Sequence, residues 1–254
     1  MHIVALTEVA QPTDAALAPV AAVVGSSAYD VRLILNGGLP AVVLVTDDGA
    51  RAARVVAELA LQGHRAFTCD RASITPSAKM TAIRVIDFGP DGIAPAEGLR
   101  ERFPYSDILC ILRATHAKTT EVVSQVKERK LRPGMAIATG GLIMTKTTSR
   151  EVRSTEEQRQ QALYIFRRNG QAPWILRERE TNYSGLGSKL APSAVQNFAT
   201  AIQELRALAP QAAYDERLLK SRPVRGVNAG IEAVDVCAHI LAADLAERAM
   251  RLRE

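Results

Sequence analysis

The sequence has few aromatic residues, few cysteines and no long apolar run. Phe, Trp and Tyr make up 4% of the 254 residues, and there is a single Trp. The core must therefore be built from Ala, Val, Ile and Leu. The scarcity of rings argues against a nucleic-acid platform that stacks bases on exposed aromatic side chains. No run of about 18 apolar residues occurs, so we expect no transmembrane segment.

The start of the chain and the cysteines bear on its location. The opening MHIVALTEVAQPTDAA has no basic leader before a long apolar stretch, and Glu8 interrupts its short apolar run, so we expect no secretory signal. Cys69, Cys110 and Cys237 are odd in number and widely spaced. We interpret them as buried thiols in a reducing compartment. These features together predict a cytoplasmic protein.

The net charge of +5 is distributed unevenly along the chain. Residues 1–75 contain five Arg and seven Asp or Glu, whereas residues 113–190 contain fifteen Lys or Arg and seven acidic residues. The N-terminal segment is therefore slightly acidic and the later segment is basic. This asymmetry predicts two surfaces with different functions.

The first 75 residues have the pattern strand, helix, helix, strand, helix, strand. Ser26 or Ser27 and Asp47 or Asp48 are candidate N-caps, and Gly25 and Gly63 are candidate helix ends. An apolar stripe at helical spacing supports the third helix. The expected strands are 2–9, 41–46 and 65–69, and the expected helices are about 15–25, 28–38 and 49–62.

The stretch GSSAYDVRLILNGGLPAVVLVTDDGARAARVVAELALQGHRAFTCD resembles a known α/β sandwich. It is similar to the C-terminal domain of the ribosomal stalk protein L7/L12 and to the protease adaptor ClpS, over about 60 residues. A short helix runs into Pro40, then come an Asp-rich turn, an Ala/Val helix and a short strand. The lysine-rich factor-binding face and the adaptor's acidic entry are both absent. The resemblance thus implies a small protein-binding domain over 1–72 and carries over no ribosomal or degradation role.

Residues 70–80 form a short polar segment with Pro76, which suits a linker. The pattern of apolar and turn residues changes after this segment. Turn residues between apolar runs then predict hairpins. The last helix either packs back across both domains or forms a homodimer seam, and we favour packing back. The expected elements are a hairpin turning at 89–92, a strand over 105–115, one or two strands over 134–148 broken at Gly140–Gly141, a hairpin over 161–180 turning at Asn169–Gly170, a helix capped by Ser193 and ended by Pro210, and a helix over 229–252.

Residues 80–210 resemble a bacterial pleckstrin-homology-like barrel. FPYSDILCILR looks like its middle strand, and PWILRERETNYSGLG with NFATAIQELRALAP looks like its last strands and closing helix. The resemblance implies a recognition module without catalysis. The whole chain is also similar to uncharacterised myxobacterial proteins, which implies no function. We therefore expect an α+β chain with a βααβαβ sandwich over 1–72, an antiparallel barrel-like domain with a closing helix over 80–210, and a helical extension over 211–254.

We find no motif for metal binding, a cofactor or catalysis. The four histidines stand alone, with no Cys-x-x-Cys or His-x-x-x-His. TGGLIMTKTTS at 139–149 lacks the order of a phosphate-binding loop, and YSGLGSK at 183–189 is better read as a loop. We assign 116–121 to a loop, Asp47–Asp48 to a helix cap and Glu156–Glu157 to a solvated helix face. The expectation is no cofactor, no metal and no enzymatic activity.

The one positive signal is a set of basic residues. They form either a solvated surface or a binding surface for a phosphate backbone, acidic lipid head groups or an acidic partner. If 163–180 is a hairpin, Arg177 and Arg179 share one face, and Arg167 and Arg168 lie at the turn with opposite directions. Trp174 is expected in the core. The candidate residues are Lys127, Arg129, Lys130, Arg132, Lys146, Arg150, Arg153, Arg167, Arg168, Arg177 and Arg179.

Three functions stay open at this point. The favoured one is a non-enzymatic adaptor or scaffold that binds other proteins through its two domains. The alternative is an electrostatic binder of nucleic acid or anionic lipid through the basic residues, which predicts an affinity that falls steeply with salt. The third is an enzyme whose site is assembled from residues far apart in the sequence.

Overall fold

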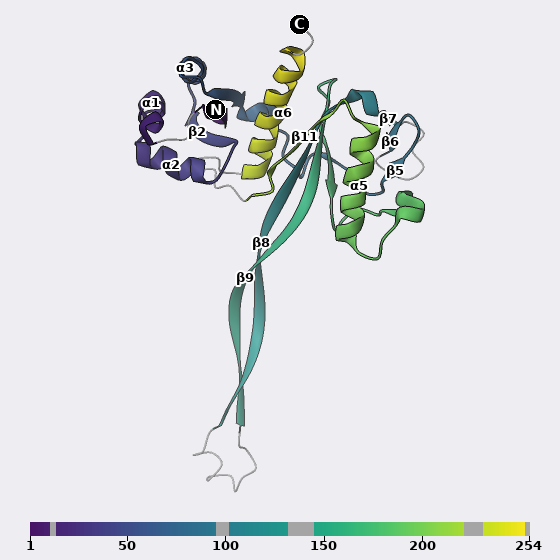
Figure 1. Cartoon of the computed structure of the whole chain (residues 1–254). Coiled ribbons are helices and arrows are strands. Elements are labelled where there is room, and N and C mark those ends of the chain that lie inside the picture. The colour runs from purple at the N-terminus through teal and green to yellow at the C-terminus, as the bar shows by residue number, and fades with distance from the viewer. Residues whose placement is uncertain (11–13, 95–101, 132–144, 221–230, 252–254) are drawn as a thin grey trace. The chain divides into compact units, whose positions relative to one another are not determined.

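The computed structural model describes residues 1–10, 14–94, 102–131, 145–220 and 231–251, and within the helices and strands it leaves the side chains of 14–16, 117–131 and 145–158 undescribed. The chain divides into two compact units. Unit 1 comprises 1–116 and 160–254, and unit 2 comprises 117–159. Figure 1 labels most of their helices and strands.

The N-terminal part of unit 1 has the predicted order of elements. Ser27 caps α2 by accepting a hydrogen bond from the backbone N–H of Asp30 (3.1 Å), and Asp48 caps α3 by accepting one from Arg51 (2.9 Å). Both predicted caps are confirmed. The elements are β1 (His2–Glu8), α1 (Asp14–Val24), α2 (Ala28–Asn36), β2 (Ala41–Thr46), α3 (Gly49–Leu61) and β3 (Arg65–Asp70).

Strand β1 lies at the centre of the first sheet and is buried on both faces. It pairs antiparallel with β2 on one side and with β3 on the other. Because side chains alternate along a strand, Val4 and Leu6 pack with α1, α2 and α3, while Ile3 and Ala5 pack on the opposite face beside α6. This double burial explains why the four central residues of β1, Ile3 to Leu6, are all apolar.

Helices α1 and α2 form a bent pair. Gly25 ends α1 with a φ of 73°, which glycine adopts without steric cost. Within the described ranges, no single helix is long and apolar enough to cross a bilayer. Leu17–Val24 and Ala28–Asn36 pass that test only as a pair, by length and composition, and they meet at 104°.

The rest of the described chain is built from short strands, two helices, and two long strands, β8 and β9, that each belong partly to unit 1 and partly to unit 2. Ser193 caps α5 by accepting a hydrogen bond from the N–H of Gln196 (3.2 Å), and the helix ends before Pro210, as predicted. The elements are β4 (Thr81–Ala82), β5 (Asp87–Phe88), β6 (Gly92–Ala94), β7 (Phe103–Pro104), β8 (Ile108–Leu131), β9 (Thr145–Arg167), β10 (Trp174–Arg177), α5 (Ala194–Leu208), β11 (Ala213–Leu218) and α6 (Ala233–Arg251), with 3-10 turns at Arg71–Ser73, Tyr105–Asp107 and Ser184–Lys189.

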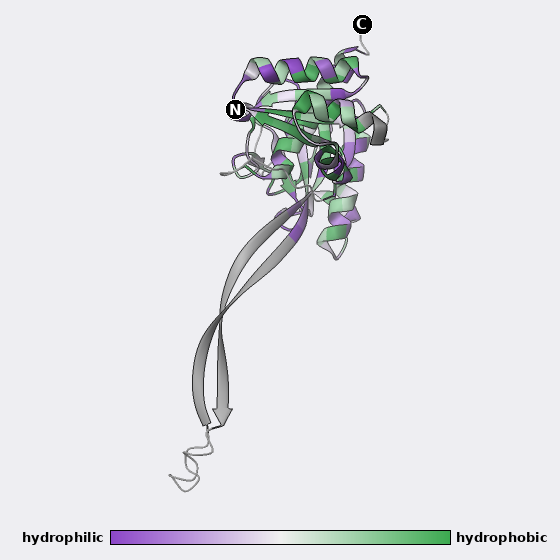
Figure 2. Ribbon diagram, turned by 90° about the vertical axis from the view of Figure 1, so that its left-hand side faces the viewer, coloured by the Kyte–Doolittle hydropathy of each residue, from purple (hydrophilic) through white to green (hydrophobic). Residues whose placement is uncertain are grey.

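A five-stranded sheet in the order β11-β8-β9-β10-β4 separates two apolar layers. On β9, Leu163 and Ile165 belong to the layer that contains Phe198 of α5. Tyr164 and Phe166 belong to the opposite layer, with α6. In Figure 2 the helices alternate between hydrophobic and hydrophilic colours along their length, as expected of helices that bury one side.

The α+β class is confirmed, but the barrel-like arrangement is not formed, since no sheet closes within the described residues. The sheet is also not purely antiparallel, because β4 pairs parallel with β10 and β11 pairs parallel with β8. Strands β5, β6 and β7 form their own small sheet.

The segment 70–80 is a packed connection, so its prediction as a linker was wrong. Ile74, Ser77 and Met80 are buried. The N–H of Thr75 donates to His239 Nε2 (3.1 Å), and the N–H of Ser77 donates to a carboxylate oxygen of Asp235 (2.9 Å). Its polar groups pair with α6 instead of water. The division of the chain into domains at 72, 80 and 210 stays a prediction.

Helix α6 packs back onto the chain, as predicted. Val236 and Ile240 contact the layer beside β1, whereas Cys237 and Leu241 contact the layer beside the five-stranded sheet. The apolar stripe that could have formed a homodimer seam is therefore covered within the chain. Cys110 and Cys237 are buried, Cys69 is partly buried, and none of the three forms a disulfide. Burial, with a contribution from Asp70, raises the pKa of the Cys69 thiol to about 11.

Candidate functional site

Unit 2, residues 117–159, contains the C-terminal part of β8 and the N-terminal part of β9, residues 117–131 and 145–159, which we call the ribbon. The two strands are neighbours in the sheet order and run side by side in Figure 1. Since a strand rises about 3.3 Å per residue, the fifteen residues of β8 in the ribbon cover roughly 50 Å. The loop predicted at 116–121 and the helix face predicted at Glu156–Glu157 are wrong, because both segments lie in strands.

Most of the predicted basic residues belong to unit 2. Lys127, Arg129 and Lys130 lie in β8, and Lys146, Arg150 and Arg153 lie in β9. Arg132 and the predicted strand break at 140–141 lie outside the described residues. The sequence from 117 to 159 contains nine Lys or Arg and five Glu, which is a net charge of +4. Unit 2 is therefore a two-stranded element of basic sequence.

Arg167 and Arg168 are occupied by unit 1 itself. The Arg167 guanidinium lies over the rings of Phe103 and Trp174, at 5.2 and 5.5 Å from their centroids, and donates to the carbonyl of Ala172 (3.1 Å). Arg168 donates to two backbone carbonyls, those of Ser106 (3.2 Å) and Gln211 (3.4 Å). The turn at Asn169–Gly170 and the core position of Trp174 are confirmed. Arg167 and Arg168 make structural contacts within unit 1.

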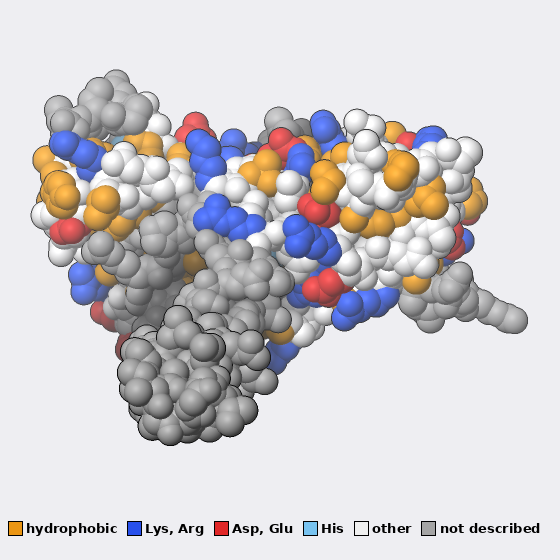
Figure 3. Space-filling model, turned by 90° about the horizontal axis from the view of Figure 1, so that it is seen from below, with side chains coloured by type: hydrophobic (Ala, Val, Ile, Leu, Met, Phe, Trp, Pro, Cys, Tyr) orange, Lys and Arg blue, Asp and Glu red, His pale blue; other side chains and the backbone are white. Residues whose placement is uncertain are grey.

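Arg177 and Arg179 do not share a strand face, because β10 ends at Arg177. Arg177 donates to the carbonyl of Ser77 (2.9 Å) and lies 3.7 Å from the carboxylate of Glu180, whereas Arg179 is exposed. Figure 3 shows Lys and Arg on the lower face of the described part interspersed with acidic and uncharged side chains. The predicted basic set is thus split between unit 1, where Arg167, Arg168 and Arg177 make contacts within the unit and Arg179 is exposed, and unit 2, which contains the other seven residues.

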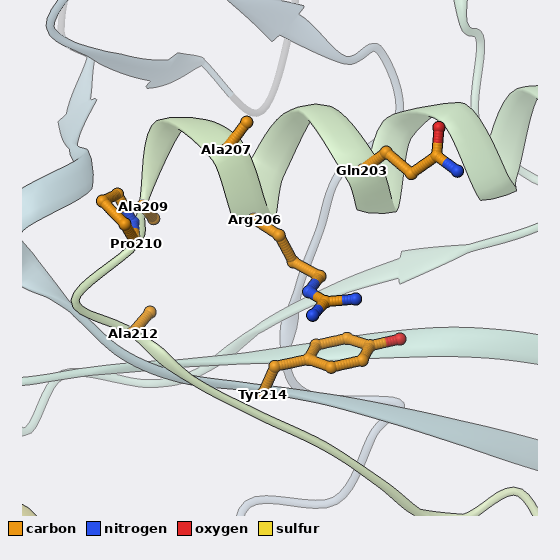
Figure 4. A pocket seen from close by; sticks show the side chains of 7 residues that line it. All are labelled: Gln203, Arg206, Ala207, Ala209, Pro210, Ala212 and Tyr214. Atoms are coloured by element: carbon orange, nitrogen blue, oxygen red, sulfur yellow. The ribbon is translucent and has the colours of Figure 1, made fainter.

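A cavity of about 440 Å³ lies between α5 and β11. The Arg206 guanidinium stacks on the Tyr214 ring, 4.2 Å from its centroid (Figure 4). Burial and the hydrogen bond to Glu216 raise the pKa of Tyr214 to about 12. The lining residues are Gln203, Arg206, Ala207, Ala209, Pro210, Ala212 and Tyr214. This wall can hold an apolar or planar group, but no residue in it could serve as a general base near neutral pH.

A chain of polar groups, which we call the His116 cluster, consists of Glu232, His116, Tyr164 and Asp235. His116, Tyr164 and Asp235 are buried, whereas the Glu232 side chain is 54% exposed. His116 Nδ1 lies 3.0 Å from a carboxylate oxygen of Glu232, and His116 Nε2 lies 2.6 Å from the Tyr164 hydroxyl. That hydroxyl donates to Asp235 (2.7 Å). The residues come from β8, β9, α6 and the chain just before α6. No spacing in the sequence connects them, so sequence reasoning treated His116 as isolated.

His239 makes two hydrogen bonds that fit a neutral ring with one N–H. Nδ1 donates to the carbonyl of Asp235 (2.9 Å), and Nε2 accepts from the N–H of Thr75 (3.1 Å). Burial lowers the pKa of His239 and outweighs the opposite effect of Asp235. Because the folded state disfavours the charged imidazole, this contribution to stability is present above the unfolded value of about 6.5 and is lost as the pH falls below it.

We therefore expect the His239→Gln variant to lose less stability in acid than the wild type. The Gln side chain oxygen can accept the Thr75 N–H without titrating. Urea unfolding followed by circular dichroism on either side of the histidine range measures this difference. Parallel stability curves for the two proteins would contradict it.

Comparisons with known proteins identified no relative of the chain. No family model matches the chain, and no curated protein and no solved structure matches it. The function has to be inferred from the residues and the geometry described above.

Proposed function

We propose that the protein binds an anionic membrane surface through the ribbon. The observation that carries this proposal is the extent of β8 and β9, which are 24 and 23 residues long and form between them a separate unit of basic sequence. Between Lys127 and Arg153 the sequence has seven basic and two acidic residues. A cluster of four to eight Lys and Arg is the usual composition of a segment that binds acidic lipid head groups.

The sequence between the two strands favours lipid over nucleic acid. Residues 133–144 contain no charged side chain, and seven of them are Met, Ala, Ile or Leu. Apolar side chains between basic ones add burial in the interface to electrostatic attraction. In unit 1, Trp174, Tyr105 and Tyr183 are buried and cannot stack bases. These features support a lipid surface as the partner.

The expected strength follows from the charge. A Lys or Arg close to an anionic membrane contributes about 1 kcal/mol. A net charge of +5 between Lys127 and Arg153 therefore corresponds to about 5 kcal/mol, which is a preference of roughly four thousandfold for anionic over neutral vesicles. The inner leaflet of the cell membrane carries the anionic lipids, which agrees with the cytoplasmic location that we propose for the protein.

Flotation with lipid vesicles tests this function. We expect the protein to float with vesicles that contain phosphatidylserine, to stay behind with phosphatidylcholine alone, and to be released by high salt because ions screen the attraction. A DNA duplex added as competitor is expected to have little effect. Binding to the duplex with no flotation would assign the ribbon to nucleic acid, and binding to neither would refute the proposal.

A second candidate is the adaptor function, in which unit 1 binds other proteins without catalysis. Tyr29 and Leu33 lie one helical turn apart on α2 and are 70% and 44% exposed. Neighbouring exposed apolar residues favour a protein contact. The adaptor proposal also includes two resemblances. Residues 1–72 resemble the L7/L12 and ClpS sandwich, and residues 80–210 resemble a pleckstrin-homology-like barrel.

The adaptor function is tested by a pull-down from a nuclease-treated lysate of the source cells. A genuine partner is expected to be recovered with the wild type and lost with the Tyr29→Ala/Leu33→Ala variant. Equal recovery with both proteins would exclude this surface of α2 as the contact.

A further inference from the structure

The His116 cluster has three contacts that each need a hydrogen atom. The first joins Glu232 to His116 Nδ1 (3.0 Å), the second joins His116 Nε2 to the Tyr164 hydroxyl (2.6 Å), and the third joins that hydroxyl to Asp235 (2.7 Å). All three are ordinary hydrogen-bond distances between heavy atoms. A pair of lone pairs would repel at such a distance.

The cluster does not supply three hydrogens when its groups are in their usual neutral-pH states. A neutral imidazole has one N–H, a phenol has one O–H, and two ionised carboxylates have none. Two hydrogens cannot satisfy three contacts. We propose that Glu232, His116, Tyr164 and Asp235 form a proton-binding site that holds one additional proton in the folded protein at neutral pH.

The surroundings place that proton on His116. Asp235 lies in the first turn of α6, where the helix dipole favours a negative charge, and its other oxygen accepts the N–H of Ser77 (2.9 Å). Burial and the nearby Asp235 raise the pKa of Tyr164 well above its usual value, so the phenol keeps its own proton. The imidazolium then donates to Glu232 and to Tyr164, and Tyr164 donates to Asp235.

The buried charges of the site offset each other. His116 is 6% exposed and Asp235 is 1% exposed, so neither charge is hydrated, and Tyr164 bridges them. The other ionisable groups nearby are His239 on α6, held neutral, and Arg177 on β10, which donates to Ser77 and lies close to Glu180. Cys237 on α6 is a buried thiol.

Loss of the proton has a structural consequence. Raising the pH removes it, and one of the three contacts is then left without a hydrogen. Two of these contacts are buried and the third joins His116 to the exposed Glu232, so the hydrogen-bond network of the site is weakened. Histidine is the side chain whose ordinary range makes such a response fall near physiological pH. Unit 1 is therefore expected to lose stability as the pH rises.

The variant that tests the count of hydrogens is Asp235→Asn. The amide oxygen can accept the Ser77 N–H while the amide NH₂ donates to the Tyr164 oxygen. Tyr164 then donates to a neutral His116, whose remaining N–H donates to Glu232. This variant supplies the third hydrogen permanently, so its stability should not depend on the proton.

We expect the unfolding constant of the wild type, measured in urea, to rise relative to that of Asp235→Asn by up to tenfold per pH unit above about pH 6.5. His116→Gln, which keeps a donor near Tyr164 without a titrating group, is expected to show the same flat profile as Asp235→Asn. All three proteins contain His64, so its effect cancels. Asp235→Asn removes a charge beside His239, but the contribution of His239 changes only below about pH 6.5, outside the range compared.

The ¹⁵N signals of the His116 ring in the wild type give a direct readout that does not depend on any variant folding. Two protonated ring nitrogens at neutral pH would support the site. A ring with one protonated nitrogen at neutral pH, or parallel pH profiles for the wild type and Asp235→Asn, would overturn it. Neither readout involves lipid binding, so the proton site and the proposed function succeed or fail separately.

Discussion

Replacing Asp244 with alanine is expected to lower the free energy of unfolding of unit 1 by about 3 kcal/mol. The Asp244 carboxylate lies on α6 with 0% exposure. It accepts hydrogen bonds from Arg65 of β3 and from Arg248 of α6 (3.1 Å), and Arg217 of β11 lies 3.8 Å away. The substitution removes the shared anion and leaves partly buried guanidinium groups around a cavity. Glu247 and Glu8 remain beside these arginines, which keeps the loss near the low end for a broken buried pair.

The pH dependence gives the Asp244 prediction a second measurement. Burial raises the pKa of Asp244, but the hydrogen bonds and charges of Arg248 and Arg65 outweigh it, so the net shift is downward. The stability due to this carboxylate is therefore present above the ordinary value of about 3.9 and is lost as the pH falls through the lower folded value. Urea unfolding curves of wild type and Asp244→Ala should differ most at neutral pH and converge in acid.

A matched control for Asp244→Ala is Glu8→Gln, which removes the exposed partner of Arg248 (3.0 Å). An exposed ion pair contributes between about 0 and 1 kcal/mol, so this variant should unfold almost like the wild type. If Asp244→Ala were as stable as Glu8→Gln, the buried carboxylate would not be what ties α6 to β3 and β11.

Neutralising four basic residues of the ribbon is expected to weaken binding to anionic vesicles on the order of a thousandfold. The variant carries Lys127→Gln, Arg129→Gln, Lys130→Gln and Lys146→Gln. Each cation near the membrane contributes about 1 kcal/mol, so the loss is about 4 kcal/mol. Titration of the protein with vesicles containing phosphatidylserine measures it, and the residual binding should depend less on salt than that of the wild type.

The control for the ribbon variant removes the same charge from unit 1. Arg54, Lys79, Arg179 and Lys220 are exposed, and their replacement by Gln gives an identical net charge. We expect this variant to lose less than about tenfold in affinity, because long-range attraction at the salt of the cell is screened beyond about 8 Å. Equal losses in the two variants would show that net charge, and not the ribbon, attracts the protein to the vesicles.

The sequence by itself determined the elements that depend on neighbours a few residues away. The order of β1 to β3, the bounds of β2, the caps Ser27, Asp48 and Ser193, and the turn at Asn169–Gly170 were all predicted. Capping, the 3.6-residue period and turn chemistry act over one or two turns of chain, so they can be recognised in a single sequence. The apolar stripe of α6 was recognised in the same way.

Only the tertiary structure decided which elements meet. The parallel partners of β10 and β8, the open sheet and the packed segment 70–80 result from contacts between residues far apart in the chain. The length of β8 and β9 was not predicted either, because the polar, charged sequence of the ribbon has no alternating apolar pattern to mark it as strand. The physical reason is that strand pairing and burial join groups from any position, as in the His116 cluster, whose members at 116, 164, 232 and 235 share a hydrogen-bond chain only once the sheet and α6 are in place.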